Sequence, residues 1–244
     1  MKEEIVYIHF ETVDSTNNWV KAHAGQLDPH ALSCISAASQ TAGRGRFKRT
    51  WISPKGENIY ATFFLTIPKE ASYLANLGQI LGYSCVEVLR KLGFSPELKW
   101  PNDILLRRKK VAGILVEALS VKEGLGIVLG IGINVNTEQE ILEIIDRPAI
   151  SLQQVQKKPW KREQILQALA VCFRENFLIL CEKGFSYFHP LFEEILAYKG
   201  ERIQCSEGPY IIEGVCKGVS VEGFLKLTLD SGEERMLHSG EIIF

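Results

Sequence analysis

Residues 97–135, ELKWPNDILLRRKKVAGILVEALSVKEGLGIVLGIGINV, contain three apolar runs with only short polar connections between them. The runs cover 97–106, 110–119 and 125–135 and are rich in Ile, Leu and Val, a composition typical of strands. Strands joined so closely pair antiparallel, because a parallel pair needs a long crossover connection. The stretch therefore predicts an antiparallel meander of three strands.

The rest of the first 200 residues alternates between strand-like and helix-like patterns. Three more runs have the composition of strands: 5–10, 31–37 and 58–67. Apolar residues recur at helical spacing in 70–92 and 161–182. We also expect a short helix at 15–24, entered through an N-cap, and another helix at 184–198. We therefore predict an α+β fold in which helices back a mixed, mainly antiparallel sheet.

The pattern changes after Lys199 and Gly200. From 201 to 244, short strand-like runs are broken by the turn sequences SEG, GVSVEG, LDSGEE and HSG. This pattern of short strands and turns is typical of a small antiparallel barrel of roughly five strands. We therefore predict two domains, at 1–198 and 199–244.

The composition is that of a soluble globular protein. Of the 244 residues 46% are hydrophobic, and 28 Lys and Arg nearly balance 29 Asp and Glu, so no basic field attracts nucleic acid. There is no secretory signal and no apolar run of the ~18 residues that cross a bilayer. We expect a cytoplasmic protein without nucleic-acid or membrane partners. The six cysteines form no C-x-x-C pair, which favours buried, reduced thiols over a zinc site.

A loop at 43–51, GRGRFKRTW, concentrates positive charge in an otherwise nearly neutral chain. Its four cations are Arg44, Arg46, Lys48 and Arg49. Gly43 and Gly45 allow the backbone to approach a ligand closely, and arginine forks suit carboxylate or phosphate groups. The loop alone supports a small-molecule anion site and a solvated surface loop about equally. A nucleic-acid contact is disfavoured by the negative net charge.

Two further stretches carry polar residues beside predicted strands. In KWPND, Pro101 interrupts the strand ladder, so Asp103 is either an outer Mg²⁺ ligand beside a polyphosphate or a simple turn residue. Lys110 begins an apolar strand, from which it could reach into a pocket as a fixed positive charge. In LGIGIN, Gly130 and Gly132 indicate either a bulge or a pocket wall, with Asn134 at its end.

The stretch DSTNNW at 14–19 precedes a predicted helix. Its Ser, Thr and Asn residues are helix caps in the simplest interpretation, with Asp14 or Ser15 as the N-cap. The same polar side chains could instead recognise a neutral polar ring. The chain has neither a P-loop nor a G-x-G-x-x-G fingerprint, so a nucleotide would be held in another way.

Taken in order, DSTNNW, SQTAGRGRFKRTWISPKGENIYATFF, KWPNDILL, KKVAGILVE and VLGIGINVN resemble the motifs of biotin protein ligases. The resemblance is strong over roughly 5–136 and extends to HSGEI near the C-terminus. It implies a class II aminoacyl-tRNA synthetase-like biotin/lipoate ligase catalytic fold followed by an SH3-like β-barrel. It also implies a short form without the DNA-binding repressor domain of some members.

The resemblance implies an activity in two steps. Biotin and ATP would react, with Mg²⁺, to biotinyl-5′-AMP and pyrophosphate, and biotin would then pass to a lysine of a biotin carboxyl carrier protein. Alternatives are a lipoate or octanoate ligase or transferase, and a non-catalytic module whose barrel binds partners. An unpaired sheet edge would permit a homodimer, which the sequence leaves open.

The resemblance also implies roles for individual residues. The implied biotin site comprises Ser15, Thr16, Asn17, Gln40, Gly43, Arg44, Gly45, Arg46, Lys110 and Gly113. The implied nucleotide site comprises Arg46, Arg49, Trp51, Lys99, Asn102, Lys110 and Asn134. The implied catalytic residues are Lys110, Arg46 and Asp103, with Asp103 also the Mg²⁺ ligand. Residues 43–50 would be a lid that orders on ligand binding, and Lys48 stands where the family often has glycine.

Overall fold

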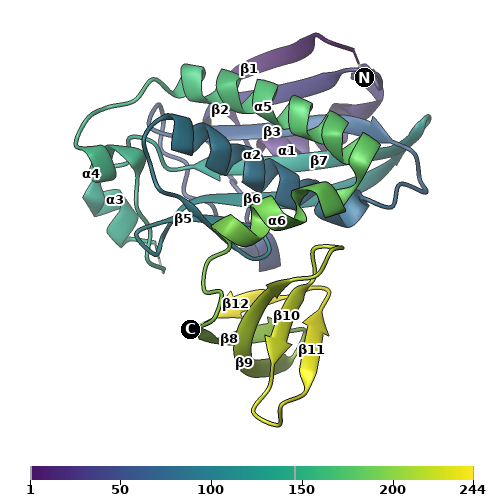
Figure 1. Ribbon diagram of the computed structural model, residues 1–244. Coiled ribbons are helices and arrows are strands. Elements are labelled where there is room, and N and C mark those ends of the chain that lie inside the picture. The colour runs from purple at the N-terminus through teal and green to yellow at the C-terminus, as the bar shows by residue number, and fades with distance from the viewer. Residues whose placement is uncertain (1, 146, 244) are drawn as a thin grey trace.

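The computed structural model describes residues 2–145 and 147–243 and contains two β-sheets (Figure 1). The larger sheet has seven strands: β1 (Ile5–Val13), β2 (Leu32–Gln40), β3 (Ile59–Ile67), β4 (Glu97–Lys99), β5 (Asp103–Leu106), β6 (Lys109–Val121) and β7 (Gly124–Ile133). Their spatial order is β1-β2-β3-β7-β6-β5-β4. Only β1 and β2 pair parallel, so the predicted mixed, mainly antiparallel sheet is confirmed.

The predicted strand at 97–106 was wrong in one respect, because it is two strands. β4 ends at Lys99 and β5 begins at Asp103, and the two pair with each other as a hairpin. Pro101 lies in the turn, where its missing N–H costs no ladder hydrogen bond. The turn leaves Asn102 and Asp103 beside β6, where Asp103 pairs with Gly113.

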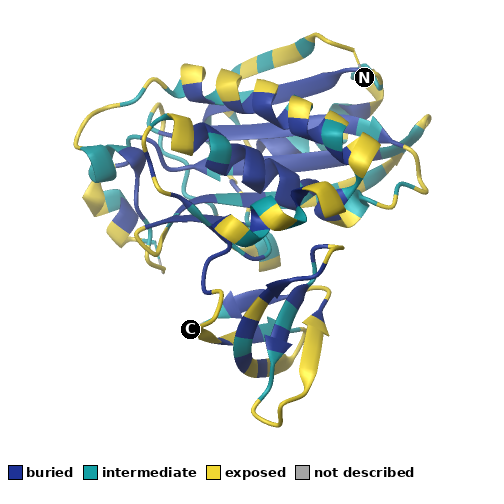
Figure 2. Cartoon of the chain, in the orientation of Figure 1, coloured by how far each residue is buried: buried dark blue, intermediate teal, exposed yellow. Residues whose placement is uncertain are grey.

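Helices cover the two faces of the large sheet unequally. The helices are α1 (Thr16–His23), α2 (Leu77–Lys91), α3 (Gln139–Glu143), α4 (Leu152–Gln156), α5 (Arg162–Lys183) and α6 (Phe185–Ile195). α2 and α5 lie across one face; α2 is buried along most of its length and packs against α5, which is exposed on its outward side (Figure 2). The short α1 packs on the other face, against β2, β3 and β7. The short helices α3 and α4 had no predicted counterpart.

The side chains of β3 point alternately to the two faces of the sheet, and this arrangement shows why one face stays free for a site. Phe63 and Leu65 point into the main core, and Phe63 packs on Phe173 of α5. Tyr60, Thr62 and Phe64 point to the opposite face, where only Phe64 joins a small apolar cluster with α1. Thr62 therefore lies between the sheet and α1, where it contacts Thr16 and Asn17, whereas the Tyr60 hydroxyl donates to the Pro54 carbonyl.

The helix α5 passes a length and composition test for a membrane span, with a mean hydropathy of 1.3 over its most apolar window. Its buried side chains, among them Phe173 and Phe177, pack in the main core. The apolarity of α5 is therefore explained by its place in this fold. Five of the six free cysteines are buried, whereas Cys181 of α5, also expected to be buried, is exposed.

The second sheet is antiparallel and has five strands, as predicted. They are β8 (Arg202–Glu207), β9 (Tyr210–Val219), β10 (Leu225–Thr228), β11 (Glu234–Leu237) and β12 (Glu241–Ile243), in the order β11-β10-β9-β8-β12. This small sheet fits an SH3-like domain. The boundary between 198 and 199 stays a prediction.

Buried hydrogen bonds attach the small sheet to the large domain. The carbonyl of Gly223 accepts from Gln79 of α2 at 2.6 Å and from the Trp100 indole at 3.1 Å. The carbonyl of Glu222 accepts from Asn76 at 2.7 Å. Because these groups are buried, their loss would leave unpaired polar atoms. The attachment brings β12 close to the loop at 43–51.

Candidate active site

Two adjoining cavities lie on the face of the sheet that carries α1. The inner pocket, of about 50 Å³, is bounded by the start of α1, β2, β3, β6, β7 and the loop at 43–51. The outer cleft, of about 530 Å³, is bounded by that loop, residues 144, 145 and 147–149, and Glu241. Five residues line both: Gly45, Arg46, Trp51, Asn102 and Lys110. Lys110 therefore stands at the junction.

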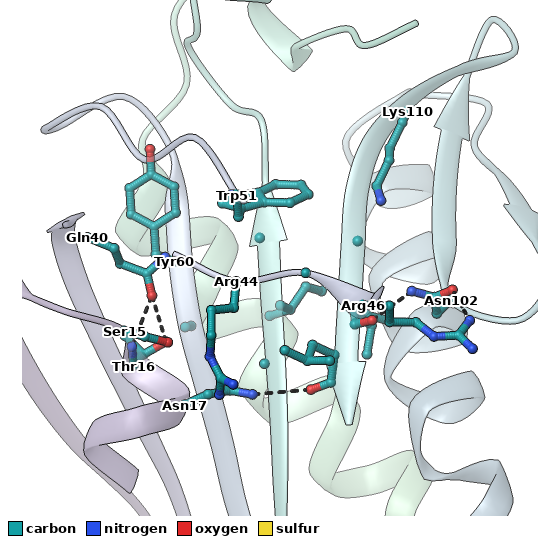
Figure 3. Close-up of a pocket in the computed structure, with 18 residues that line it drawn as sticks. Ser15, Thr16, Asn17, Gln40, Arg44, Arg46, Trp51, Tyr60, Asn102 and Lys110 are labelled. Atoms are coloured by element: carbon teal, nitrogen blue, oxygen red, sulfur yellow. Dashed lines mark hydrogen bonds between the residues drawn. The ribbon is translucent and has the colours of Figure 1, made fainter. Parts of the chain in front are cut away.

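The polar end of the inner pocket is a closed hydrogen-bond network. Ser15 occupies the N-cap position of α1 but makes no capping bond, so the simple helix-cap interpretation of its side chain is wrong. The Thr16 backbone N–H donates to Gln40 Oε1 at 2.9 Å. Thr62 Oγ1 lies 2.7 Å from both Thr16 Oγ1 and Asn17 Oδ1. In Figure 3 Ser15, Thr16, Asn17 and Gln40 lie opposite Lys110 and Asn102.

Glycines form the floor of the inner pocket because larger residues would not fit. A Cβ atom on Gly130 would lie 2.2 Å from Asn17 Oδ1, and one on Gly132 would lie 2.2 Å from the Trp51 ring. A Cβ atom on Gly113 would lie 2.8 Å from Lys110 Nζ. Gly130 and Gly132 lie in a regular ladder with β3, so the pocket-wall interpretation of LGIGIN is correct and the bulge is not.

A carboxylate absent from the predicted site, Glu117 of β6, fastens three elements together. It accepts from Asn17 Nδ2 at 2.9 Å, from Lys21 Nζ at 2.8 Å and from Arg44 Nη2 at 2.8 Å. Burial would raise the pKa of Glu117, but the hydrogen bonds from Lys21 and Asn17 and the charge of Arg44 outweigh it, so the pKa is lowered. Glu117 is therefore ionised at neutral pH.

The loop at 43–51, called the lid below, turns back on itself. Arg44 pairs with Thr50 as an isolated bridge, and the Gly45 N–H donates to the Arg49 carbonyl at 2.8 Å. At its tip Phe47 and Lys48 have φ angles of 55° and 60°, the left-handed region that favours glycine. This finding gives a physical reason for the glycine that the family often has where this chain has Lys48.

Lys110 and Asp103 form an ion pair of 2.6 Å at the junction of the two cavities. Lys110 Nζ also lies 5.5 Å from the centre of the Trp51 ring. The Trp51 indole N–H is buried and has no hydrogen-bond partner within the described part of the chain. A buried unpaired donor beside a cavity is a candidate ligand contact.

Cations from the lid reach the outer cleft and the small sheet. Arg46 donates to Asn102 Oδ1 and to the Gly240 carbonyl, both at 3.0 Å. Asn102 in turn donates to the Ile114 carbonyl at 2.8 Å, which fixes its amide orientation. Arg46 is therefore held both by the turn that follows β4 and by the segment just before β12.

Glu241 of β12 accepts from Arg49 at 2.8 Å and also pairs with Arg147. Burial would raise the pKa of Glu241, but its bonds to Arg147 and Arg49 outweigh that effect and lower the pKa. Burial lowers the pKa of Lys99, a half-buried residue with Asp103 and Glu241 nearby. The outer cleft thus gathers cations around two carboxylates.

The structure brings most of the predicted site residues to these cavities. The inner pocket is lined by Ser15, Thr16, Asn17, Gln40, Arg44, Gly45, Arg46, Trp51, Asn102, Lys110 and Gly113. The outer cleft adds Arg49, Asp103 and Asn134. Gly43 and Lys99 line neither cavity, since Gly43 is packed against Gln40 and the Trp51 carbonyl.

Sequence reasoning missed Thr62, Glu117, Arg147 and Glu241. Thr62 and Glu117 lie inside strand-like runs, and Arg147 lies in a segment that carried no recognised motif. The only available signal was HSGEI, which contains Glu241 and matched a family motif without an assigned role.

A polar pocket that meets a cationic cleft at Lys110 and Arg46 is suited to a ligase that activates a carboxylic acid with a nucleotide. The chain belongs to the Biotin/lipoate A/B protein ligase family, whose model matches residues 9–134. The predicted family resemblance and catalytic fold are thereby confirmed.

Individual relatives agree with this membership. The Bifunctional ligase/repressor BirA of Escherichia coli K12 is 32% identical over 238 residues, which cover 94% of this chain and 73% of that protein. The Biotin--[acetyl-CoA-carboxylase] ligase of Paracoccus denitrificans is 30% identical, covering 95% and 97% of the two chains. The biotin protein ligase from Aquifex aeolicus in complex with biotin and ATP superposes with a TM-score of 0.85 at 34% identity, covering 98% and 97%.

Proposed function

We propose that this site joins the carboxylate of biotin to the α-phosphate of ATP, releases pyrophosphate, and transfers biotin from biotinyl-5′-AMP to a lysine of a biotin carboxyl carrier protein. The observation that carries the proposal is the position of Lys110, which lines both the neutral inner pocket and the cationic outer cleft. A carboxylate tail and a phosphate would meet there. Biotin has the matching shape, a neutral ureido ring with a carboxylate at the end of a chain.

The inner pocket would bind the ring and the outer cleft the nucleotide. Thr16, Asn17 and Gln40 form the polar network at one end of the inner pocket, and Ser15 stands beside them. Asn102 and Asn134 line the outer cleft, with Arg49 at its rim. Gly43 and Lys99 would act by shaping the lid and by adding positive charge near Asp103.

The first step brings two anions together, so positioning and charge compensation are the main catalytic tasks. Lys110 would leave its pair with Asp103 and bind the biotin carboxylate and the α-phosphate. Arg46 would hold the lid over both and compensate further negative charge. No general base is required, because the attacking carboxylate is already ionised at neutral pH.

The donor set fits a magnesium ion that arrives with the nucleotide. No cluster of three or more His, Cys, Asp or Glu side chains that could hold a metal occurs among the described residues. Mg²⁺ often binds through one carboxylate together with substrate phosphates, and Asp103 supplies one at the edge of the outer cleft. Bound there, Mg²⁺ would neutralise phosphate charge.

In the second step the carrier lysine attacks the adenylate and must be neutral. Asp103 is the proposed acceptor of its proton, because it lines the outer cleft beside Lys110. The lid would exclude water from the adenylate until the carrier arrives. An unpaired edge at β1, where Val6 and Tyr7 are exposed, is available for homodimerisation. The cytoplasmic location and the absence of a nucleic-acid partner stay predictions of the sequence.

One experiment separates this function from its alternatives. The purified chain is incubated with ATP, Mg²⁺ and either labelled biotin or labelled octanoate, together with a carrier domain. We expect biotin-dependent pyrophosphate release and labelling of the carrier lysine. Activity with octanoate alone would indicate the lipoate-type alternative, and no activity with either acid would indicate a binding module.

A further inference from the structure

Glu117 is connected to the inner pocket through a chain of hydrogen bonds. The chain runs from Glu117 to Asn17, from Asn17 to Thr62, and from Thr62 to Thr16. Thr62 is completely buried, and Thr16 and Asn17 are 3% and 4% exposed, so water has little access to the bonds between these three residues, whereas Glu117 is partly exposed. The direction of each bond can therefore be worked out from donor and acceptor chemistry alone.

The carboxylate fixes the amide of Asn17. An ionised carboxylate only accepts hydrogen bonds, so Asn17 must present Nδ2 to Glu117. The same nitrogen lies 3.5 Å from the Leu115 carbonyl, a second acceptor on that side. A flipped amide would place Oδ1 against two oxygens. Asn17 Oδ1 therefore points at Thr62.

The direction then passes from Asn17 to Thr16. Asn17 Oδ1 only accepts, so Thr62 gives its single hydroxyl proton to that oxygen, 2.7 Å away. Thr62 consequently accepts from the Thr16 hydroxyl, also at 2.7 Å. Thr16 Oγ1 also lies 3.3 Å from Gln40 Oε1, which only accepts, but the contact with Thr62 is shorter and takes the single hydroxyl proton. In either arrangement Thr16 Oγ1 has only lone pairs left for the pocket. The backbone N–H of Thr16 is already committed to Gln40.

We infer that Glu117 is a positioning residue that sets the inner pocket as a hydrogen-bond acceptor, suited to the N–H groups of a ureido ring. This inference rests on the proposed function, since it concerns the ring of biotin. An octanoyl or lipoyl chain has no N–H group, so the network favours biotin over such acids. Discrimination of this kind is strong where a buried polar group would otherwise be left unpaired.

Lys21 keeps Glu117 in place without help from the lid, so the hydrogen-bond directions in the inner pocket do not depend on the lid. Arg44 shares Glu117 Oε2 with Asn17, whereas Lys21 of α1 holds Oε1 at 2.8 Å. If the lid opens and Arg44 leaves, Glu117 keeps a charged partner on the rigid side. The acceptor character of the inner pocket therefore persists in the open state.

Two variants test the inference at different links. Thr62→Val removes the middle hydroxyl without touching Lys21 or Arg44, and Glu117→Gln removes the charge that sets the direction. The matched control is Glu123→Gln, an exposed carboxylate at the turn between β6 and β7. Biotin-dependent pyrophosphate exchange gives KM and kcat, with octanoate as a competing acid, and thermal unfolding checks the fold.

We expect the KM for biotin to rise about tenfold in Thr62→Val and in Glu117→Gln, as for the loss of one buried hydrogen bond near a charge. The KM for ATP, the kcat and the inhibition constant of octanoate stay within about twofold, because octanoate does not use the network. Glu123→Gln matches the unaltered chain.

An unchanged biotin KM in Thr62→Val, or an equal loss for biotin and octanoate, would overturn the role of the network. A rise in Glu117→Gln alone would also overturn it, since the carboxylate would then act through Arg44. If the unaltered chain shows no biotin-dependent exchange, the proposed function itself fails, and the role of Glu117 fails with it.

Discussion

The inner pocket and the lid recognise different chemistry and are built differently. Thr62 in the pocket is completely buried, whereas Phe47 at the tip of the lid is 59% exposed. Neutral hydrogen bonds between a sheet and a helix set the pocket, while ion pairs and bonds to the small sheet hold the lid. We therefore expect the site for the neutral ring to exist before binding, and the site for the anion to be completed when the lid closes.

The difference between the inner pocket and the lid follows from the chemistry of the ligand part that each would bind, a neutral ring or an anion. A neutral ring binds weakly unless its polar partners are already oriented, because their ordering would cost free energy on binding. An anion is attracted to cations from a distance, so exposed arginines on a loop suffice for its capture. The cations here are held near the cleft by Asp103 and Glu241. These carboxylates keep the positive charges in place before the phosphates arrive.

Replacing Lys110 should produce the largest effect, because this residue belongs to both regions. In Lys110→Met we expect kcat for biotin-dependent pyrophosphate exchange to fall about 10²–10³-fold, as for the loss of one group that stabilises transition-state charge. The neighbouring Lys109→Met, at an exposed position of the same strand, serves as control. Activity within twofold of the unaltered chain would show that the two regions are not joined through Lys110.

Removing the contacts of Arg46 should impair the lid and leave the hydrogen-bond network of the inner pocket largely unchanged. In Arg46→Gly the bonds to Asn102 and Gly240 are lost, so we expect escape of the adenylate and random labelling of lysines on a bystander protein to rise about tenfold. Biotin binding should change less, because the hydrogen-bond network of Thr16, Asn17 and Thr62 stays intact. Arg107→Gly is the control, since Arg107 is exposed and has a φ of 53° that glycine accepts. Retained strict selectivity for the carrier would contradict this prediction.

Weakening the contact between the lid and the small sheet should have a smaller effect. In Glu241→Gln we expect the KM for ATP to rise about two- to fivefold, because partly exposed ion pairs contribute little each. A double-mutant cycle with Arg49→Met should show coupling between the two sites. No coupling would mean that β12 does not help to hold the lid.

The same pair predicts a pH dependence of stability. The pKa of Glu241 is lowered from its usual 4.5 in the fold. Its contribution to the free energy of unfolding is therefore fully present above that value and is lost as pH falls through the lowered pKa. Urea unfolding of the unaltered chain and Glu241→Gln should differ above pH 5 and converge in acid. A difference that grows on acidification would have the wrong sign.

The smallest effect is expected at Lys48. Glycine there removes left-handed strain of about 1 kcal/mol but adds flexibility to the open loop, and the two nearly cancel. We expect the melting temperature of Lys48→Gly to stay within about 4 °C and the KM for biotin within about twofold. Lys48→Val, whose branched side chain resists a φ of 60°, should impair lid closure more. Equal behaviour of the two variants would show that the tip conformation is unimportant.

The sequence predicted the sheet and most of the site because both leave local signals. The meander is visible in consecutive apolar runs, and the lid in its glycines and arginines. Thr62 and Glu117 left no such signal, because their role depends on contacts with Asn17, which lies 45 and 100 residues away from them in the sequence. The left-handed tip at Phe47 and Lys48 was also hidden, since neither residue type favours it.

Hydrogen exchange compares the two regions most directly. Backbone amides of residues 43–50 and of β3 are followed in the free chain and with biotin and ATP. We predict that the lid amides exchange fast in the free chain and become protected with ligand, whereas the β3 amides are protected in both states. Equal protection of the lid in both states, or ligand-dependent protection of β3, would contradict a preformed pocket closed by a mobile lid.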